Sequence, residues 1–398
     1  MEVSGWLTAG LTGSGLSLAM GLGFVARETQ RRHVGAWLGP LLAQSLIAQR
    51  PRSQRETHLI LAIADHYEPR AGGASDAVAQ SRVDRWVDEY PRQLGHFRDA
   101  DGRPPRHTFF YPFDEYTPSH LDALSTLCRA GFGEVELHLH HDGDTAETLR
   151  AKLREAVRVY SERHGLLPKS KFTHTLAYGF VHGNWALNNA RPDGCWCGVN
   201  DEIRVLRETG CYADFTFPSA PSPTQPRTVN RIYYATSNPT HPRGHEWGQA
   251  VGDGPAPEGA LMLITGPLAL DWGRRKWGLL PRLENGCLQP SQPPSLARLP
   301  LWLHAGIRVP TRPDWLFVKL HAHGAPENEA DVLLGPPMIA FHQALSRKAA
   351  EDPSFHVHYV TAREMYNLAR AAEQGWTGPV AEARDFELVW KPDRSSQP

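Results

Sequence analysis

The chain has 398 residues, of which 41% are hydrophobic and 21% are charged, a balance typical of a folded globular protein rather than a disordered chain or a coiled coil. Lys and Arg total 42 and Asp and Glu total 43, so the net charge of −1 gives no support to a nucleic-acid partner. Five cysteines cannot form a disulfide framework in a chain of this length, whereas 20 histidines are many for a residue type that binds metals and moves protons.

The first fifty residues differ from the rest and are expected to form an apolar segment and a linker (1–50), followed by a single domain over residues 51–398. Residues 6–25 carry no charge and are long enough to span a bilayer as a helix, and three arginines follow them directly. The positive-inside rule then predicts a membrane-associated protein whose domain lies in the cytoplasm. A loosely docked tail is the alternative. Residues 34–48, too short to span easily, either lie on the membrane surface or pack on the domain.

From residue 58 onward, apolar runs typical of strands alternate with helical patterns. Strands are expected at 58–64, 107–111, 134–140, 175–181, 211–217, 260–265, 315–320 and 355–360. Helices are expected at 81–97, from Ser119, from a capping box at 144–147, at 200–209 and from a second capping box at 361–364. This order predicts an α/β fold, which we interpret as an irregular (β/α) barrel of seven or eight strands with loop-rich insertions at 218–259 and 268–295. A doubly wound nucleotide-binding sheet is disfavoured, because no glycine-rich loop follows the first strand.

Polar side chains gather where the expected strands end, which is where (β/α) barrels place their active sites. The first strand ends at Asp65 and His66, and the third contains His138 and His140 before Asp142. The two-residue repeat of a strand puts His138 and His140 on one face. Two imidazoles at this spacing, beside the Asp-His pair of another strand, indicate a divalent metal site, and zinc suits such nitrogen and oxygen donors. Hydrogen-bonded core histidines are the alternative interpretation.

Further polar groups follow other strands and are expected at the same mouth. His182, Asn184 and Trp185 follow the fourth strand, Asp214 lies in the fifth, and His321 ends the seventh. We interpret His182, Asn184, Trp185 and Asp214 as candidate substrate-binding residues, with a structural role as the open alternative for each.

The cysteines give no comparable signal. Cys195 and Cys197 are separated by one residue, and Cys211 lies further on. A structural zinc site usually has two cysteine pairs at a wider spacing, so buried free thiols are expected here.

Residues 58–365 resemble the polysaccharide deacetylase family of metal-dependent carbohydrate esterases. The resemblance is carried by Ala64-Asp65-His66, by the histidine cluster at 138–142 and by Leu320-His321. The chain looks most similar to a group of uncharacterised bacterial deacetylase-like proteins that share the segments at 138–142, 182–187 and 191–194. The family fold is an irregular (β/α) barrel, usually with seven strands.

The resemblance implies roles for the residues at the first two motifs. Asp65 stands at the position of the catalytic base, and His66 stands at the position of a metal ligand where the family has a second Asp. His138 matches the first of two ligand histidines four residues apart. Asp142 stands where the second belongs, and His140 is the alternative for that place.

The late motif of the family matches Leu320-His321, which implies that His321 is the general acid. The third motif, an Arg before Pro-Tyr, is missing at 180–185. The implied reaction removes an acetyl group from an N-acetylated sugar or polysaccharide, with Asp65 taking a proton from metal-activated water and His321 protonating the leaving amine. Family members usually act outside the cytoplasm, so a periplasmic or extracytoplasmic domain is the alternative to the charge rule.

Two other functions stay open. A glycoside hydrolase of a related barrel needs two carboxylates across a sugar, and Asp65 with Asp214 is the pair we nominate. A non-catalytic carbohydrate-binding or assembly protein of a polysaccharide export system fits the missing third motif, but not the retained Asp65, His66, His138 and His321. Neither the oligomeric state nor the identity of the sugar is specified by the sequence.

Overall fold

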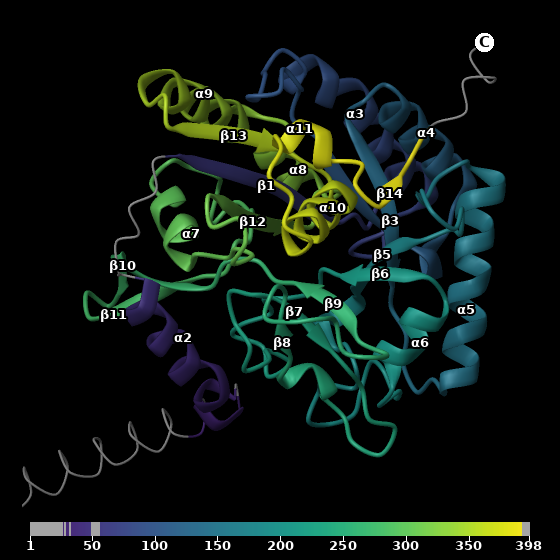
Figure 1. Ribbon diagram of the computed structural model, residues 1–398. Coiled ribbons are helices and arrows are strands. Elements are labelled where there is room, and N and C mark those ends of the chain that lie inside the picture. The colour runs from purple at the N-terminus through teal and green to yellow at the C-terminus, as the bar shows by residue number, and fades with distance from the viewer. Residues whose placement is uncertain (1–26, 28, 32, 49–55, 392–398) are drawn as a thin grey trace, which may run out of the picture.

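A computed structural model describes residues 27, 29–31, 33–48 and 56–391 and shows a mixed α/β fold around one large sheet (Figure 1). Its parallel strands are β1 (Thr57–His66), β2 (His107–Pro112), β3 (Gly133–Leu139), β5 (Tyr178–His182), β6 (Cys211–Asp214), β9 (Leu261–Ile264), β12 (Trp315–Ala322) and β13 (Phe355–Tyr359). At one end of the sheet, β7 (Ile232–Ala235) pairs antiparallel with β9 and with the edge strand β8 (Gln249–Ala250). Each parallel strand coincides within a few residues with an expected one, because buried parallel strands are nearly continuous apolar runs.

The long strand β1 organises its neighbours. The order across the sheet is β12-β1-β2-β3-β5-β6-β9-β7-β8, and β13 also pairs with β1. Asp65 is paired with Ala322 of β12, and His66 is paired with Phe110 of β2. Because these strands run parallel, the carboxyl ends of β1, β2, β3 and β12 lie at the same edge of the sheet.

The sheet is strongly curved, although its hydrogen-bonded path does not close among the described strands. The path ends at β12 on one side and at β8 on the other. Lys319 of β12 donates hydrogen bonds of 2.6 Å to the carbonyl oxygens of both Phe215 and Phe217, just beyond β6. A Cβ atom at Gly266, just beyond β9, would lie 2.3 Å from the Lys319 carbonyl oxygen. The expected α/β class is confirmed, whereas these strands do not form the closed ladder of a barrel.

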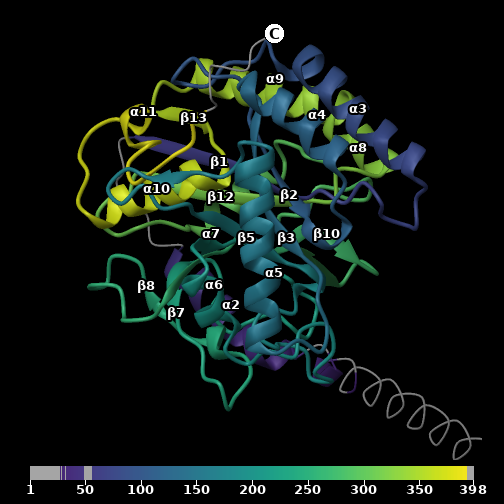
Figure 2. The same cartoon turned by 90° about the vertical axis from the view of Figure 1, so that its right-hand side faces the viewer.

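Helices and apolar clusters cover both faces of the curved sheet. The outer face carries α3 (Asp76–Leu94), α4 (Pro118–Arg129) and α5 (Ala146–Arg158), and α5 lies in front of the strands in Figure 2. The cluster on this face includes Leu61, Trp86, Leu124 and Leu153. The strand residues that point the other way join α10 (Ala362–Glu373) in a second cluster that includes Ile60, Phe215 and Met365. The two-residue alternation of the strands therefore separates two layers of core.

Capping boxes begin two helices of the domain. The expected box at 361–364 begins α10. At the start of α5 the box is formed by Thr145 and Thr148. It therefore begins one residue later than the box expected at 144–147. In both cases side-chain oxygens accept backbone N–H groups that have no partner inside the helix.

Smaller elements surround the sheet. The insertion expected at 268–295 contains the hairpin β10 (Ala269–Lys276) and β11 (Leu280–Glu284), and β4 (Lys169–Ser170) pairs with β14 (Leu388–Val389). The remaining helical segments include η1 (Phe113–Glu115), η2 (Val159–Arg163), η3 (Gly183–Trp185), α6 (Glu202–Glu208), η4 (Gly244–Glu246), α7 (Leu299–Ala305), α8 (Glu327–Leu333), α9 (Pro336–Glu351) and α11 (Val380–Ala383).

The helix α2 (Val34–Ala48) packs on the domain, which is one of the two placements expected for this stretch. Trp37 and Leu41 are buried against Ala220, Val229 and Leu268. The segment 6–25, expected to be an anchor, lies outside the described residues. Among the helices that are described, none has the length and apolar character needed to cross a membrane.

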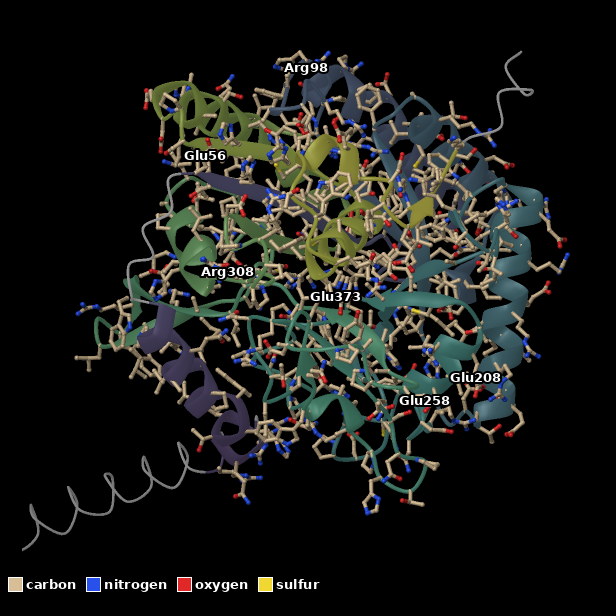
Figure 3. The ribbon with its side chains drawn as sticks, in the orientation of Figure 1. Glu56, Arg98, Glu208, Glu258, Arg308 and Glu373 are labelled. Atoms are coloured by element: carbon tan, nitrogen blue, oxygen red, sulfur yellow. The ribbon has the colours of Figure 1, made fainter. Side chains whose placement is uncertain are left out.

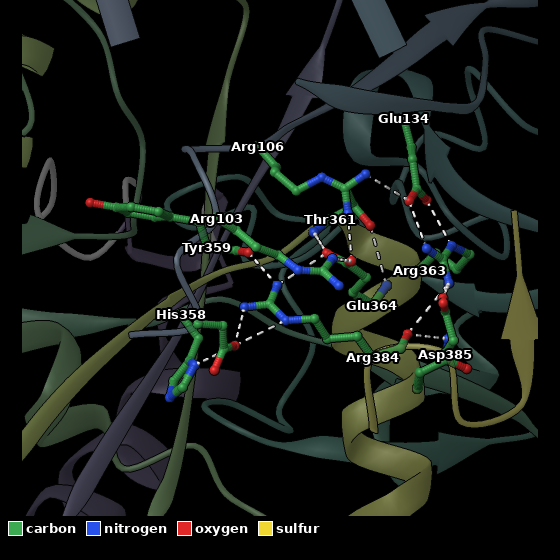
Figure 4. Close-up of polar contacts among 12 residues, drawn as sticks. Arg103, Arg106, Glu134, His358, Tyr359, Thr361, Arg363, Glu364, Arg384 and Asp385 are labelled. Carbon is green, nitrogen blue, oxygen red and sulfur yellow. Dashed lines mark hydrogen bonds and ion pairs between the residues drawn. The ribbon is translucent and has the colours of Figure 1, made fainter. Parts of the chain in front are cut away.

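A buried ion-pair network joins α10 to the amino ends of β2 and β3 (Figure 4). Glu364 accepts a hydrogen bond of 2.5 Å from Arg106. Arg363 binds both carboxylate oxygens of Glu134, at 2.8 and 2.9 Å. Burial alone would raise the pKa of Glu364, but the charges of Arg106, Arg384 and neighbouring guanidinium groups lower it from 4.5 to about 2.

Other charged side chains lie at the surface. Arg98, Glu208 and Glu258 are exposed and lie on the outside of the molecule (Figure 3). Exposed pairs such as Arg158 with Glu155 are screened by water and contribute little to stability. Removing one partner from the buried network around Glu364 should therefore cost more stability than removing one partner of an exposed pair.

The variant Glu364→Gln removes the buried charge and nearly keeps the shape of the side chain. We expect a loss of roughly 3–5 kcal/mol in the free energy of unfolding at neutral pH, because the guanidinium groups lose their partner. Since folding lowers the pKa of Glu364, its contribution is fully present above about pH 4.5 and is lost as the pH falls toward 2. Urea unfolding over this acid range should show a shallower pH dependence in the variant than in the wild type.

The control is Glu382→Gln, which changes an exposed carboxylate of α11. It should leave both the stability at neutral pH and the acid dependence unchanged. Equal behaviour of the two variants would contradict the role assigned to Glu364.

Candidate metal centre

Five side chains at the carboxyl ends of β1, β3 and β12 form one cluster of possible metal ligands. They are His66 at the end of β1, Glu68 beyond it, His138 and His140 at the end of β3, and His323 beyond β12. The ligand atoms of Glu68, His138 and His140 all lie within 4.8 Å of one another, and those of His66, Glu68 and His323 form a second such group. Glu68 belongs to both groups and links them.

The tautomer of His138 is set by the backbone. Its Nδ1 atom lies 2.8 Å from the carbonyl oxygen of Val181, and since a carbonyl only accepts, Nδ1 carries the proton. In the neutral ring, Nε2 then presents a lone pair 3.1 Å from Oε1 of Glu68. Two acceptors at this distance repel each other unless a proton or a metal cation lies between them.

Asp114, in the short helix η1 after β2, orients His140 in a similar way. One oxygen of Asp114 accepts the backbone N–H of His140 at 2.9 Å, and the other lies 3.1 Å from Nδ1 of the ring. Nε2 of His140 is 3.5 Å from Oε1 of Glu68. Carboxylate and carbonyl partners behind ligand imidazoles are usual in metal sites, where they fix the tautomer and the ring orientation.

Charge is distributed unevenly over the cluster. Although burial opposes the shift, Asp114 and Glu68 raise the pKa of His140 to about 10. Against the effect of burial, His138 and His140 lower the pKa of Glu68 below its usual range. Burial and the neighbouring rings lower the pKa of His66, and burial also lowers the pKa of His323. These shifts favour the neutral imidazole at His66 and His323 and the protonated form at His140, whose proton a bound cation would displace.

The cluster is accessible from one side. The side chain of His140 retains 28% of its exposure and that of Glu68 retains 18%, whereas His138 is fully buried. Trp185 lies beside the other two rings, with centroid distances of 6.0 Å to His66 and 5.9 Å to His323. An aromatic ring therefore lies next to the possible ligands.

Asp65, the expected base, lies on the face of β1 opposite to His66. Its Oδ1 accepts the backbone N–H of Gly324 at 2.6 Å, and its Oδ2 lies 2.8 Å from Nε2 of His107. Glycine is required for this approach, because a Cβ at Gly324 would lie 2.3 Å from Oδ2 of Asp65. The carboxylate of Asp65 thus links β1 to β2 and to the segment after β12. It points away from the cluster of possible metal ligands.

Asp142 and His182 also lie outside the cluster. Asp142, an expected ligand, is exposed and accepts the backbone N–H of Trp196 at 2.6 Å. β3 ends at Leu139, so the spacing from the ligand histidines to Asp142 no longer follows the strand period. His182, an expected substrate-binding residue, is fully buried and its Nε2 lies 3.5 Å from Glu202.

Of the other expected residues, Trp185 and His321 lie near the cluster. Asn184 and Trp185 belong to η3, and Trp185 contacts the rings described above. Asp214 is buried and accepts hydrogen bonds from the backbone and the hydroxyl of Thr216, so it does not face a second carboxylate across a sugar site. His321, the expected general acid, is buried within β12, and its Nδ1 has no hydrogen-bond partner in the described part of the chain.

The expected ligand set left out Glu68 and His323, although both stand at strand ends in the sequence, and it did not include Asp114. The signal for two of them was present, because Glu68 and His323 each follow two residues after an inward-facing histidine, His66 and His321. No local sequence pattern marks Asp114, because its carboxylate comes close to His140 only when β2 and β3 pair side by side in the sheet.

Comparisons with protein-family models and with curated proteins found no match for the chain. The assignment of a function therefore depends on the geometry and the chemistry of these side chains.

The variant Asp65→Asn tests the structural role of this carboxylate. We expect a loss of ~1–3 kcal/mol in the free energy of unfolding, because the amide nitrogen cannot accept from Gly324 or His107 and a buried donor loses its partner. The measurement is unfolding in guanidinium chloride, with Asp84→Asn on the exposed side of α3 as a control. Unchanged stability combined with a large loss of turnover would instead support Asp65 as the base.

Proposed function

We propose that the protein is a metal-dependent hydrolase that removes acetyl groups from an N-acetylated sugar or polysaccharide. The observation that carries the proposal is the donor set of Glu68, His138 and His140, in which Val181 and Asp114 hold the outer nitrogens of the two rings. Two histidines and one glutamate are the ligands of known catalytic zinc sites, which keep a fourth position for water or substrate. Zinc is therefore the ion we propose.

The donor set fits a divalent cation chemically. A cation between Nε2 of His138 and Oε1 of Glu68 replaces the repulsion of two acceptors 3.1 Å apart with two attractive contacts. Imidazole and carboxylate donors suit zinc, and the partial exposure of His140 and Glu68 leaves one side of the site accessible. We propose that His66 and His323 flank this ion rather than bind it.

Zinc supplies Lewis-acid chemistry when bound, since it lowers the pKa of a coordinated water and polarises a carbonyl. The protein's own residues supply the proton transfer. His323 is half-buried, its ring lies 4.8 Å from that of His66, and it shares a ligand group with Glu68. We assign to a ring nitrogen of His323 the acceptance of the proton from water and its return to the leaving amine. Asp65 is a poorer candidate, because both of its oxygens are already bonded.

The substrate class is proposed from the resemblance of residues 58–365 to the polysaccharide deacetylases. Trp185 supports it, because an aromatic face beside His66 and His323 suits the apolar face of a sugar ring. The contacts of Lys319 with the carbonyls beyond β6 support the irregular barrel as the finer description of the curved sheet.

Zinc binding by single variants distinguishes the two overlapping ligand groups. We expect His138→Ala and His140→Ala each to lose one equivalent of zinc, because each removes a ligand from the proposed site. His323→Ala should keep that equivalent. Calorimetric titration of chelator-treated full-length protein measures the difference. If His323→Ala loses the ion and His140→Ala keeps it, the ligand assignment is wrong.

Acetate release from a panel of N-acetylated oligosaccharides tests the reaction itself. We expect His323→Ala to lower kcat by ~10²–10⁴-fold with little change in KM, which is the usual contribution of a proton-transferring group. The control is His304→Ala, which changes an exposed histidine of α7 and should keep full activity. A zinc-loaded wild-type protein that releases no acetate from any member of the panel would contradict the proposed function.

A further inference from the structure

We propose that a second zinc ion, with a structural role, binds in the core between His141, His182, Cys197 and Glu202. All four side chains are buried, and their ligand atoms lie within 4.8 Å of one another. They come from the end of β3, the end of β5, the segment before α6 and the first turn of α6. The proposed hydrolysis uses none of these four residues.

Inside this buried cluster His141 pairs with Glu202, whereas His182 leaves one acceptor without a donor among the described residues. Oε1 of Glu202 lies 3.1 Å from Nε2 of His141 and 3.5 Å from Nε2 of His182. His182 donates its Nδ1–H to the carbonyl of Gly183, so Nε2 of the neutral ring carries a lone pair. That Nε2 atom is buried and has no hydrogen-bond partner in the described chain. Such an arrangement is costly in the core, and a cation between the groups removes the cost.

Two backbone amides are directed at the sulfur of Cys197, although burial and Glu202 raise the pKa of the free thiol, so a bound cation is needed to favour the thiolate. Its sulfur accepts the backbone N–H groups of Asn189 at 3.3 Å and Val199 at 3.4 Å, and it lies 3.4 Å from Oε2 of Glu202. Two amide donors directed at one sulfur stabilise negative charge on it. In a metal-free alternative, the thiol donates its proton to Glu202.

The charges of the four ligands match a divalent ion. Although burial opposes the shift, Asp144 and Glu202 raise the pKa of His141 to about 9, so binding releases a proton from this ring as well as the thiol proton of Cys197. The thiolate and the carboxylate then carry two negative charges beside two neutral imidazoles, and a divalent cation makes the buried site electrically neutral. Asp144 supports the site from behind, since its Oδ2 lies 3.2 Å from Nδ1 of His141.

A closed set of sulfur, nitrogen and oxygen donors is typical of structural zinc, and complete burial leaves no position open for substrate. The ion would hold the segment 186–201, which forms no helix or strand, against β3, β5 and α6. The site also borders the candidate metal centre, because a Cβ at Gly183 would lie 2.4 Å from the ring of His140. Loss of the buried ion should therefore disturb the outer site indirectly.

X-ray absorption at the zinc edge on purified full-length protein separates the two sites, because only the buried one contains sulfur. We expect a zinc–sulfur distance of about 2.3 Å both in the wild type and in the double variant His138→Ala/His140→Ala. Cys197→Ser should lose one equivalent of zinc, the sulfur signal and thermal stability. Cys195→Ser changes an exposed cysteine of the same segment and should lose none of these.

Zinc without sulfur neighbours in the wild type, or an unchanged spectrum in Cys197→Ser, would overturn the buried site and leave the proposed function standing. A single zinc ion with a sulfur neighbour would support the buried site and count against the outer one. If Cys197→Ser does not fold, cobalt substitution of the wild type decides. Thiolate-to-cobalt charge-transfer absorption in the near ultraviolet supports the proposal, and its absence contradicts it.

Discussion

The parallel pairing of β1 with its neighbours is the constraint on which the rest of the structure depends. Ala64 pairs with His321 of β12, His66 pairs with Phe110 of β2, and Pro112 of β2 pairs with His138 of β3. Because parallel strands share a direction and their side chains alternate between faces, imidazoles distant in the chain reach one edge of the sheet on one face. The backbone ladder therefore brings His66 and His138 together, and Glu68, His140 and His323 follow within two residues of the strand ends.

The carboxyl end of β5 sets the chemistry of both histidine clusters. The carbonyl of Val181 accepts from Nδ1 of His138, and the carbonyl of Gly183 accepts from Nδ1 of His182. Each contact fixes a tautomer whose Nε2 carries a lone pair, which is the form that binds metals. The end of β5 thus orients one histidine of the accessible candidate metal centre and one histidine of the buried cluster. Gly183 lies between the two sites and packs against His140.

The two edges of the sheet differ in how completely their charges are paired. At the amino edge, the carboxylates of Glu134 and Glu364 are matched by guanidinium groups at hydrogen-bond distance. At the carboxyl edge, Glu68 and Glu202 face ring nitrogens that are themselves acceptors in their neutral forms. Matched buried pairs stabilise a fixed arrangement, whereas opposed acceptors need a proton or a metal cation. The paired charges at the amino edge therefore stabilise the fold, whereas the side chains at the carboxyl edge are the candidate metal ligands.

The sequence by itself determined the eight parallel strands and the inward direction of His138 and His140, because apolar runs and the two-residue strand period are local properties. It also identified His66 at a strand end, whereas the partners of Asp65 and the distance of Asp142 from the cluster required the folded chain. Tertiary structure alone decided that Glu68 meets His138, 70 residues away. The reason is that such contacts depend on the order of strands in the sheet and on where the chain turns after each strand, which local periodicity does not encode.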